Sequence, residues 1–272
     1  MVYKGCDIGS AKPDKNILEK YPHEMIDVIS PNRIFSVADF HRASHEIIRK
    51  THLARKLPLF VGGSMMYFKS LLDGMHELPH RDENYRAELE NLKEQNKSNY
   101  LYDLLKKKDP EYAKTINKND EVRIIRALEV FKLQNKPLSN ILKENQKESL
   151  KNNFAVSQFG IIEDRQNIHK RIEKRLKEMF DNGLQQEAEN LLDCYKIPEN
   201  HPIRKSVNYK QFFSYLNGEY DMETCFKKAL YATRQLAKRQ STWIKSWNDF
   251  TEISTRDIRI IEDEFKNIIS LL

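Results

Sequence analysis

Residues 38–74 constrain the fold of this chain more than any other stretch, because three structural patterns follow one another there. Residues 38–56 carry apolar side chains at helical spacing, which predicts a helix. The run LPLFV at residues 57–61 predicts a short buried strand, and two glycines and a second predicted helix at residues 64–74 follow it. A helix, a buried strand, a glycine turn and a helix in this order are typical of a parallel α/β layer. The apolar positions of the first helix are Phe40, Ile47 or Ile48, and Leu53.

Residues 82–153 have a different character. They are rich in Lys, Asn and Glu, have helical periodicity and contain no apolar run that suits a strand. An apolar stretch returns at residues 154–162, FAVSQFGII, and predicts another strand of the α/β core. The sequence therefore predicts an α/β core made of residues 1–80 and 154–272, with a helical insertion at residues 81–153. The candidate helices of the insertion are residues 84–95, 100–107, 111–116 and 121–134.

Most of the remaining chain is also expected to be helical. Asp164 and Gly183 flank a predicted helix at residues 165–182, in positions that suit an N-cap and a C′ residue. Gly and Pro account for only 8 and 9 residues, which favours long helices over an all-β fold with many tight turns. The apolar stripe of the helix at 165–182 is Ile168, Ile172, Leu176 and Met179. Further helices are predicted at residues 205–217, 221–247 and 257–272.

Composition excludes several classes of protein. No apolar run reaches the roughly 18 to 20 residues that a membrane span needs, and the first residues lack the apolar centre of a secretory signal. Cys6, Cys194 and Cys225 are too far apart for a CxxC metal clip and too few for a disulfide framework. These features predict a cytoplasmic protein without a membrane segment.

The net charge of +6 is modest, but the charges are unevenly distributed. Residues 224–248 contain no acidic side chain and six basic ones, a pattern that suits a polyanion such as a nucleic acid or a diphosphate. Within this stretch, Arg234, Lys238 and Arg239 alternate with glutamines that can read base edges. Trp243 and Trp247 fit better as core anchors than as stacking platforms for bases.

One pair of arginines could bind a phosphorylated ligand. Arg171 and Arg175 are four residues apart on one predicted helix, so their guanidinium groups leave the same face and can clamp a diphosphate. The alternative is a solvated face on which Glu173 and Glu178 are their partners.

A second pair, Arg123 and Arg126, borders residues that look like core. These arginines suit contacts with RNA phosphates or an ion pair with Glu129, and the pattern leaves both interpretations open. The neighbours expected in the core are Val122, Ile125, Leu128 and Leu133.

No other catalytic pattern is present. His41 and His45 are four residues apart but lack the HExxH context, and the remaining histidines have no metal-ligand spacing. No glycine is followed by lysine, so a GxxxxGK[ST] phosphate loop is absent from this sequence. The glycine pair at residues 62–63 suits either an anion site at a helix N-terminus or an ordinary tight turn.

In their order along the chain, these motifs resemble those of the tRNA dimethylallyltransferases, also called tRNA isopentenyltransferases. The resemblance covers essentially the whole chain, and the ordered series is far more specific than any single motif. The matching stretches are VYKGCDIGSAKP (2–13), YPHEMIDVISP (21–31), FSVADF (35–40), LPLFVGGSMMYFKSLLDG (57–74), NDEVRIIRALEVFKLQNKPLS (119–139), DRQNIHKRIEKRLKEMFDNGL (164–184), KSVNYKQFFSYLNG (205–218) and ATRQLAKRQSTWIKSW (232–247).

The resemblance implies a P-loop-type, nucleotide-binding parallel sheet core with a helical insertion domain. The implied reaction transfers a dimethylallyl group from dimethylallyl diphosphate to N6 of the adenosine on the 3′ side of the anticodon. It gives N6-isopentenyladenosine in tRNAs that read codons starting with U. The implied cofactor is Mg²⁺, which assists diphosphate departure, and the base must be flipped out of the anticodon loop. The implied partners are the tRNA anticodon stem-loop and dimethylallyl diphosphate, and the implied enzyme is a cytoplasmic monomer.

The resemblance also implies roles for individual residues. Arg175, with Arg171, looks like the diphosphate clamp. Ser64 stands where the family has the Thr of a GGT motif, Val122 replaces a usual Gln, and Asn208 stands where Gly is usual. Together with the basic segment, the residues expected to contact tRNA are Ser64, Arg86, Arg123, Arg126, Lys205, Asn208, Tyr209, Lys210, Arg234, Lys238 and Arg239.

The sequence departs from the family pattern at its start. The family begins with a strand, a phosphate loop of GPTASGKT type and a second strand ending in Asp-Ser, which supply the phosphate-binding Lys and the general base. This sequence begins at Met1, after those elements, so we expect them upstream in an ordinary longer enzyme. The alternative is a truncated, non-catalytic tRNA-binding protein. A P-loop nucleotide kinase is disfavoured by the acid-free segment.

Overall fold

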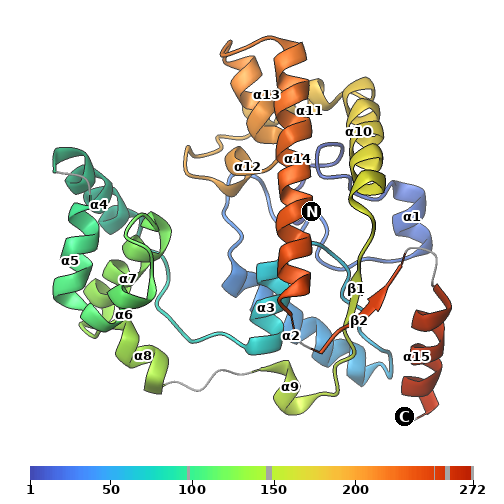
Figure 1. Ribbon diagram of the computed structural model, residues 1–272, viewed down its shortest axis with the longest axis horizontal. Helices are drawn as coiled ribbons and strands as arrows, with labels where there is room; N and C mark the ends of the chain where they lie inside the picture. The colour runs from blue at the N-terminus through green and yellow to red at the C-terminus, as the bar shows by residue number, and fades with distance from the viewer. Residues whose placement is uncertain (97–98, 145–148, 248, 255–257, 271–272) are drawn as a thin grey trace. The chain divides into compact units, whose positions relative to one another are not determined.

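The computed structural model describes residues 1–96, 99–144, 149–247, 249–254 and 258–270 (Figure 1). The chain forms two compact units. The first contains Met1–Phe68 and Ala155–Leu272, and the second contains Lys69–Phe154.

The first unit contains most of the helices and both strands. Its elements are α1 (Lys15–Lys20), α2 (Val37–Leu53), the start of α3 (Met65–Asp73), β1 (Phe159–Ile161), α10 (Arg165–Asp181), α11 (Leu184–Cys194), α12 (Pro202–Lys205), α13 (Tyr209–Leu216), α14 (Met222–Lys245), β2 (Thr251–Ile253) and α15 (Ile258–Ser270). The second unit holds the end of α3 and α4 (Glu83–Gln95), α5 (Tyr100–Lys108), α6 (Pro110–Thr115), α7 (Glu121–Gln134), α8 (Leu138–Glu144) and α9 (Leu150–Asn153).

The sheet is small and parallel. Strands β1 and β2 pair in the register Phe159 with Thr251 and Ile161 with Ile253. One further parallel bridge joins Tyr3 to Ile29. The described residues are therefore mostly helical with a small parallel sheet, and the expected α/β character is confirmed only at this coarse level.

The buried strand predicted at residues 57–61 is wrong. No strand forms there, and the side chains of Leu59 and Val61 are 63% and 85% exposed. A strand needs hydrogen bonds to a neighbour, and no other described segment pairs with this one. The strand predicted at residues 154–162 is reduced to Phe159–Ile161 for the same reason, since β2 pairs with only three of its residues.

The core of the first unit lies between α10, α11, α13 and α14, which Figure 1 shows in orange and yellow. The predicted stripe of α10 is confirmed at Ile172, Leu176 and Met179, which are buried, while Ile168 is half-buried. These side chains pack against Leu184 of α11 and other apolar residues of the same cluster. Burial of this stripe is the main force that holds α10 in place, because apolar burial stabilises by roughly 25 cal/mol per Å².

The single helix predicted at residues 205–217 is instead two helices, α12 and α13. Asn208 separates them, with φ at +74°, outside the helical region. Among non-glycine residues, Asn tolerates positive φ best. Its backbone N–H donates to Oε1 of Gln211 at 2.9 Å, which begins α13. The break allows Asn208 and Tyr209 to face inward while Lys205 and Lys210 stay exposed.

Helix α2 begins with a capping box, in which Ser36 and Asp39 bond to one another's backbone N–H. Phe40 and Ile48 are buried as predicted, but Leu53 is 73% exposed because the helix ends there. The ring of Phe40 stacks on Tyr67 at a centroid distance of 4.1 Å and thereby ties α2 to the first turn of α3.

The second unit has its own core around α5 and α7. Its buried centre includes Leu89, Leu105, Ile124 and Leu128. Ile125 and Leu128 lie in the core as expected, whereas Val122 and Leu133 are exposed. Both lie near an end of α7.

The helix predicted at residues 257–272 corresponds to α15, and its residues 257, 271 and 272 lie outside the described residues. None of the helices that the structure describes is long and apolar enough to cross a membrane.

Candidate functional site

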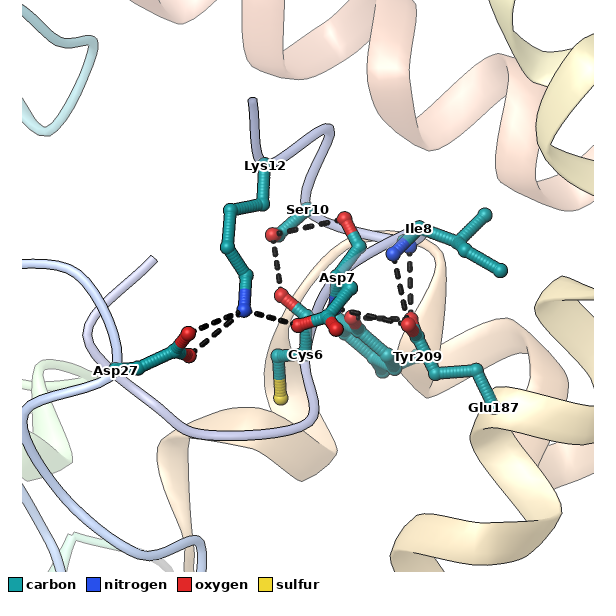
Figure 2. A network of polar contacts seen from close by, with 9 residues as sticks. Cys6, Asp7, Ile8, Ser10, Lys12, Asp27, Glu187 and Tyr209 are labelled. Atoms are coloured by element: carbon teal, nitrogen blue, oxygen red, sulfur yellow. Dashed lines mark hydrogen bonds and ion pairs between the residues drawn. The ribbon is translucent and has the colours of Figure 1, made fainter. Parts of the chain in front are cut away.

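The most connected polar site in the first unit is the loop at residues 6–12 and its anchor on α11 (Figure 2). The carboxylate of Glu187 accepts hydrogen bonds from three consecutive backbone N–H groups, those of Asp7 (2.8 Å), Ile8 (2.7 Å) and Gly9 (2.9 Å). The hydroxyl of Tyr209 donates to the same carboxylate at 2.7 Å. Consecutive N–H groups in a turn form an anion-binding nest, and here a side chain of the protein fills it.

Gly9 lets the loop lie directly on α11 and α13. A Cβ atom at this position would lie 2.7 Å from the ring of Tyr209 and 2.8 Å from Cδ1 of Leu184. The carbonyl of Gly9 also accepts a hydrogen bond from Nδ2 of Asn208 at 2.9 Å. Asn208 and Tyr209, both expected to contact tRNA, are therefore buried and bonded to this loop. Burial raises the pKa of Tyr209 far above its usual range, so its hydroxyl remains a donor.

Lys12 closes the other end of the loop. Its side chain is only 7% exposed and forms ion pairs with Asp7 and Asp27, the latter at 2.7 Å (Figure 2). Burial alone would lower the pKa of Lys12, but the two carboxylates raise it. Lys12 therefore stays charged and ties the loop to the segment that carries Asp27.

We expect Glu187→Gln to lower the free energy of unfolding by about 1–3 kcal/mol, because one carboxylate oxygen becomes an NH2 group, which cannot accept from the donors that face it. Urea denaturation followed by circular dichroism measures this change. Glu189→Gln is the matched control on the same helix, since among the described residues Glu189 bonds only to the side chain of Gln185. Equal stability of the two variants would show that the nest contributes nothing.

A second candidate element is the N-terminus of α3. Ser64 precedes α3 and its carbonyl accepts from the N–H of Tyr67 at 2.8 Å. Nε2 of Gln240, on α14, donates to the carbonyl of Gly63 at 2.9 Å. A Cβ on Gly63 would lie 2.3 Å from that nitrogen, so glycine allows the contact. The structure thus brings Ser64 beside the basic segment of α14.

The aromatic residues of this segment anchor it only partly. Trp243 and Trp247 are half-buried, and Trp247 meets Phe68 edge-on at a centroid distance of 6.5 Å. The contact holds the end of α14 against the first turn of α3.

The expected diphosphate clamp lies on α10, beside α14. Arg171 is exposed and pairs with Glu163 at 2.5 Å. Arg175 is exposed, and no ion pair to it is found among the described residues. Arg234 of α14 bonds to Glu173 of α10 at 3.1 Å, which joins the two helices. Of the two arginines expected to form the clamp, Arg175 is therefore the one without a competing carboxylate among the described residues.

Lys238 and Arg239 are exposed on α14, and Lys205 and Lys210 are exposed on α12 and α13. These four cations are open to a polyanion. They lie in the same compact unit as Ser64 and Arg175.

In the second unit, a buried carboxylate organises the arginines. Glu129 is fully buried, and Arg86 binds it with two hydrogen bonds of 2.6 and 2.8 Å. Arg126 also pairs with Glu129, and it donates to the carbonyl of Pro79 at 2.7 Å. Burial alone would raise the pKa of Glu129, but these hydrogen bonds and one from the N–H of Asp82 lower it to about 2.

Arg123 behaves differently from Arg126. Its side chain is 63% exposed and pairs with Asp120, one turn earlier, at 2.8 Å. The two interpretations that the sequence left open therefore divide between the two residues: Arg126 pairs with Glu129, and Arg123 remains accessible.

Sequence reasoning missed Glu187 and Lys12, and it considered Glu129 only as an alternative partner. The three backbone N–H groups that bind Glu187 lie about 180 residues before it in the chain, so no local pattern could have revealed them. Among the described residues, no group of three His, Cys, Asp or Glu side chains is placed to hold a metal ion.

Comparison with known proteins gives a consistent result. The sequence model of the IPP transferase family matches residues 1–247. The tRNA dimethylallyltransferase of Hydrogenovibrio crunogenus is 39% identical over 250 residues, which cover 92% of this chain and 76% of the relative.

Two solved structures are similar as well. The tRNA isopentenylpyrophosphate transferase of Bacillus halodurans matches with a TM-score of 0.63 and 30% identity, covering 99% of this chain and 84% of that one. A eukaryotic dimethylallyltransferase acting on tRNA matches with a TM-score of 0.74 over 95% of this chain and 66% of that one. At 22% identity, this second likeness concerns the fold alone.

The fold and the ordered motifs define a transferase-type protein of mostly helical architecture. The chain belongs to the IPP transferase family, and the resemblance inferred from its sequence motifs is confirmed.

Proposed function

We propose that this protein transfers a dimethylallyl group from dimethylallyl diphosphate to N6 of the adenosine on the 3′ side of the anticodon of tRNA. The product is N6-isopentenyladenosine, and the substrates are tRNAs that read codons starting with U. The observation that carries the proposal is the family match over residues 1–247. The names of its relatives, which are tRNA dimethylallyltransferases, support the same reaction.

In this reaction the bond between C1 of the allyl group and the diphosphate oxygen breaks, and a bond from N6 to C1 forms. The diphosphate departs with its electron pair, and the proton that N6 loses passes to the departing diphosphate or to water. Arg175 is the residue best placed to neutralise the leaving group, because it is exposed and free of a carboxylate partner in the described structure. Arg171 supports it after exchanging Glu163 for the diphosphate.

The tRNA contacts are proposed for two groups of residues. The first unit offers Ser64, Lys205, Lys210, Arg234, Lys238 and Arg239. The second unit, a helical insertion that we assign to tRNA binding, offers Arg123 directly. Arg86 and Arg126 already bind Glu129, so any contact that they make with RNA keeps these ion pairs. Their main role is then to hold α4 and α7 together. Asn208 and Tyr209 act through the loop at residues 6–12.

The remaining parts of the proposal rest on the family resemblance. They are a P-loop-type core, Mg²⁺ as cofactor, a monomeric state and a cytoplasmic location. A Mg²⁺ ion bound with dimethylallyl diphosphate would take most of its ligands from phosphate oxygens and water.

The test measures transfer of a labelled dimethylallyl group to tRNA transcripts by the purified protein. We expect label in a tRNA with adenosine 3′ to the anticodon, and none when guanosine replaces that base. Label that survives the replacement would contradict the proposed site of modification. No label in any tRNA would contradict the transferase activity.

We expect Arg123→Ala to weaken tRNA binding and to lower the slope of log Kd against log salt concentration by about 1, because one phosphate contact is lost. Filter binding at several salt concentrations measures the slope. Lys107→Ala removes an exposed cation from α5 of the same unit and is the charge-matched control. A slope unchanged by Arg123→Ala would leave Arg123 with only its ion pair to Asp120.

A further inference from the structure

The solvent-facing side of α14 carries an aromatic residue within a row of cations. Successive helical residues turn by about 100°, so residues 227, 231, 234, 238 and 245 share one face. We call this row the basic stripe of α14; its members are Lys227, Tyr231, Arg234, Lys238 and Lys245. The opposite face carries Cys225 and Ala229, which are fully buried in the core.

Tyr231 is the member of the stripe that packing does not explain. Its side chain is 65% exposed, and the described residues give it no hydrogen bond, ion pair or ring contact. Single exposed apolar residues are common on protein surfaces, so exposure alone would mean little. Its position is more informative, because Tyr231 lies within the segment at residues 224–248 that contains no acidic residue.

The charges around Tyr231 favour a polyanion. Lys227, about 6 Å before it along the helix axis, and Lys238, about 10 Å after it, are both exposed. Lys227 pairs with Glu223 in a solvated contact of 2.5 Å, and Arg234 pairs with Glu173 of α10. The exposed pair between Lys227 and Glu223 contributes little and is easily exchanged for a phosphate. Lys238 has no ion pair among the described residues.

We propose that Tyr231 is a base-stacking residue: an unpaired nucleobase of the bound RNA stacks on its phenol ring, and Lys227 and Lys238 hold the neighbouring phosphates. An exposed ring between cations is the arrangement by which proteins bind single-stranded RNA, since every base has a face that can stack. This inference rests on the proposed function, because a tRNA loop supplies the unpaired base.

The test compares Tyr231→Ala and Tyr231→Phe in the full-length protein. We expect Tyr231→Ala to raise the Kd for a tRNA transcript and for a single-stranded RNA oligonucleotide by about 5- to 100-fold. The slope of log Kd against log salt should not change, because stacking releases no counterions. Tyr231→Phe keeps the ring and should bind like the unaltered protein. Lys238→Ala should lower the slope by about 1.

Two controls separate the proposals. Tyr21→Ala removes an equally exposed tyrosine, 57% accessible, from a different part of the same unit and should leave binding unchanged. A blunt RNA duplex offers no unpaired base, so Tyr231→Ala should not weaken binding to it. If Tyr231→Ala binds the oligonucleotide as well as Tyr21→Ala does, the stacking role is wrong. If the unaltered protein binds the oligonucleotide but neither binds nor modifies tRNA, the proposed function is wrong. The role of Tyr231 is then still decided by comparing how Tyr231→Ala and Tyr21→Ala bind the oligonucleotide.

Discussion

Replacing Glu129 by alanine is expected to lower the free energy of unfolding of the second unit by about 3–5 kcal/mol. Glu129 is fully buried and accepts hydrogen bonds from Arg86, Arg126 and the N–H of Asp82. Its removal leaves two guanidinium groups partly buried without a counter-charge. Such a loss is far larger than that of an exposed ion pair, which is usually below about 1 kcal/mol.

Urea denaturation monitored by circular dichroism measures the effect. Glu121→Ala is the matched control, because Glu121 lies on the same helix and pairs with Lys93 in an exposed contact of 2.9 Å. We expect this control to change stability by less than about 0.5 kcal/mol. If Glu129→Ala is as stable as Glu121→Ala, the buried network does not hold the unit together.

The same carboxylate predicts a pH dependence. The pKa of Glu129 is about 2 in the folded chain, against 4.5 for an ordinary glutamate, so the folded state favours the charged form. Its contribution of about 3 kcal/mol is therefore complete above pH 4.5 and disappears as the pH falls toward 2. In the Glu129→Gln variant, stability should fall less steeply across this range. An identical acid profile for both proteins would refute the assignment.

The second large effect is expected at Arg175. Arg175→Ala should reduce dimethylallyl transfer by about 100-fold, because one preorganised charge that stabilises the departing diphosphate is lost. Arg175→Lys should recover only part of the rate, since an ammonium keeps the charge but lacks the planar fork that binds two oxygens. The readout is kcat/KM for label transfer to tRNA.

Lys174→Ala is the control for Arg175. Lys174 precedes Arg175 on α10 and its side chain is 81% exposed. Among the described residues, Lys174 forms an ion pair only with Glu178, at a long distance of 3.9 Å. Both substitutions remove one exposed cation, so general attraction of tRNA changes equally. If kcat/KM falls equally in the two variants, Arg175 contributes only to the surface charge. If kcat/KM is unchanged in Arg175→Ala, Arg175 does not belong to the site.

Helices were the part of the fold that could be predicted most fully. The stripe Ile172, Leu176 and Met179 marked the inner face of α10 correctly, and the cap at Asp164 placed its start. Helical hydrogen bonds join residues four apart, so the pattern that specifies them is local. The break at Asn208 was missed, because its positive φ depends on hydrogen bonds to Gln211 and to the loop at Gly9.

The candidate site was predicted only in part. Its arginines and lysines were found because basic residues gather in two short segments and match a family motif. Their partners were not found. In the structure, Glu129 pairs with both Arg86 and Arg126, and Glu173 pairs with Arg234. These contacts depend on how the helices pack, which no local pattern shows.

By itself, the sequence determined most of the longer helices, the basic segment at residues 224–248 and membership of the family. These properties depend on nearby residues or on the order of motifs. Only the tertiary structure decided that residues 57–61 form no strand, that Glu187 anchors the loop at residues 6–12, and that Tyr231 faces solvent. Strand pairing, buried carboxylates and surface exposure all depend on residues far apart in the chain, and folding alone brings these together.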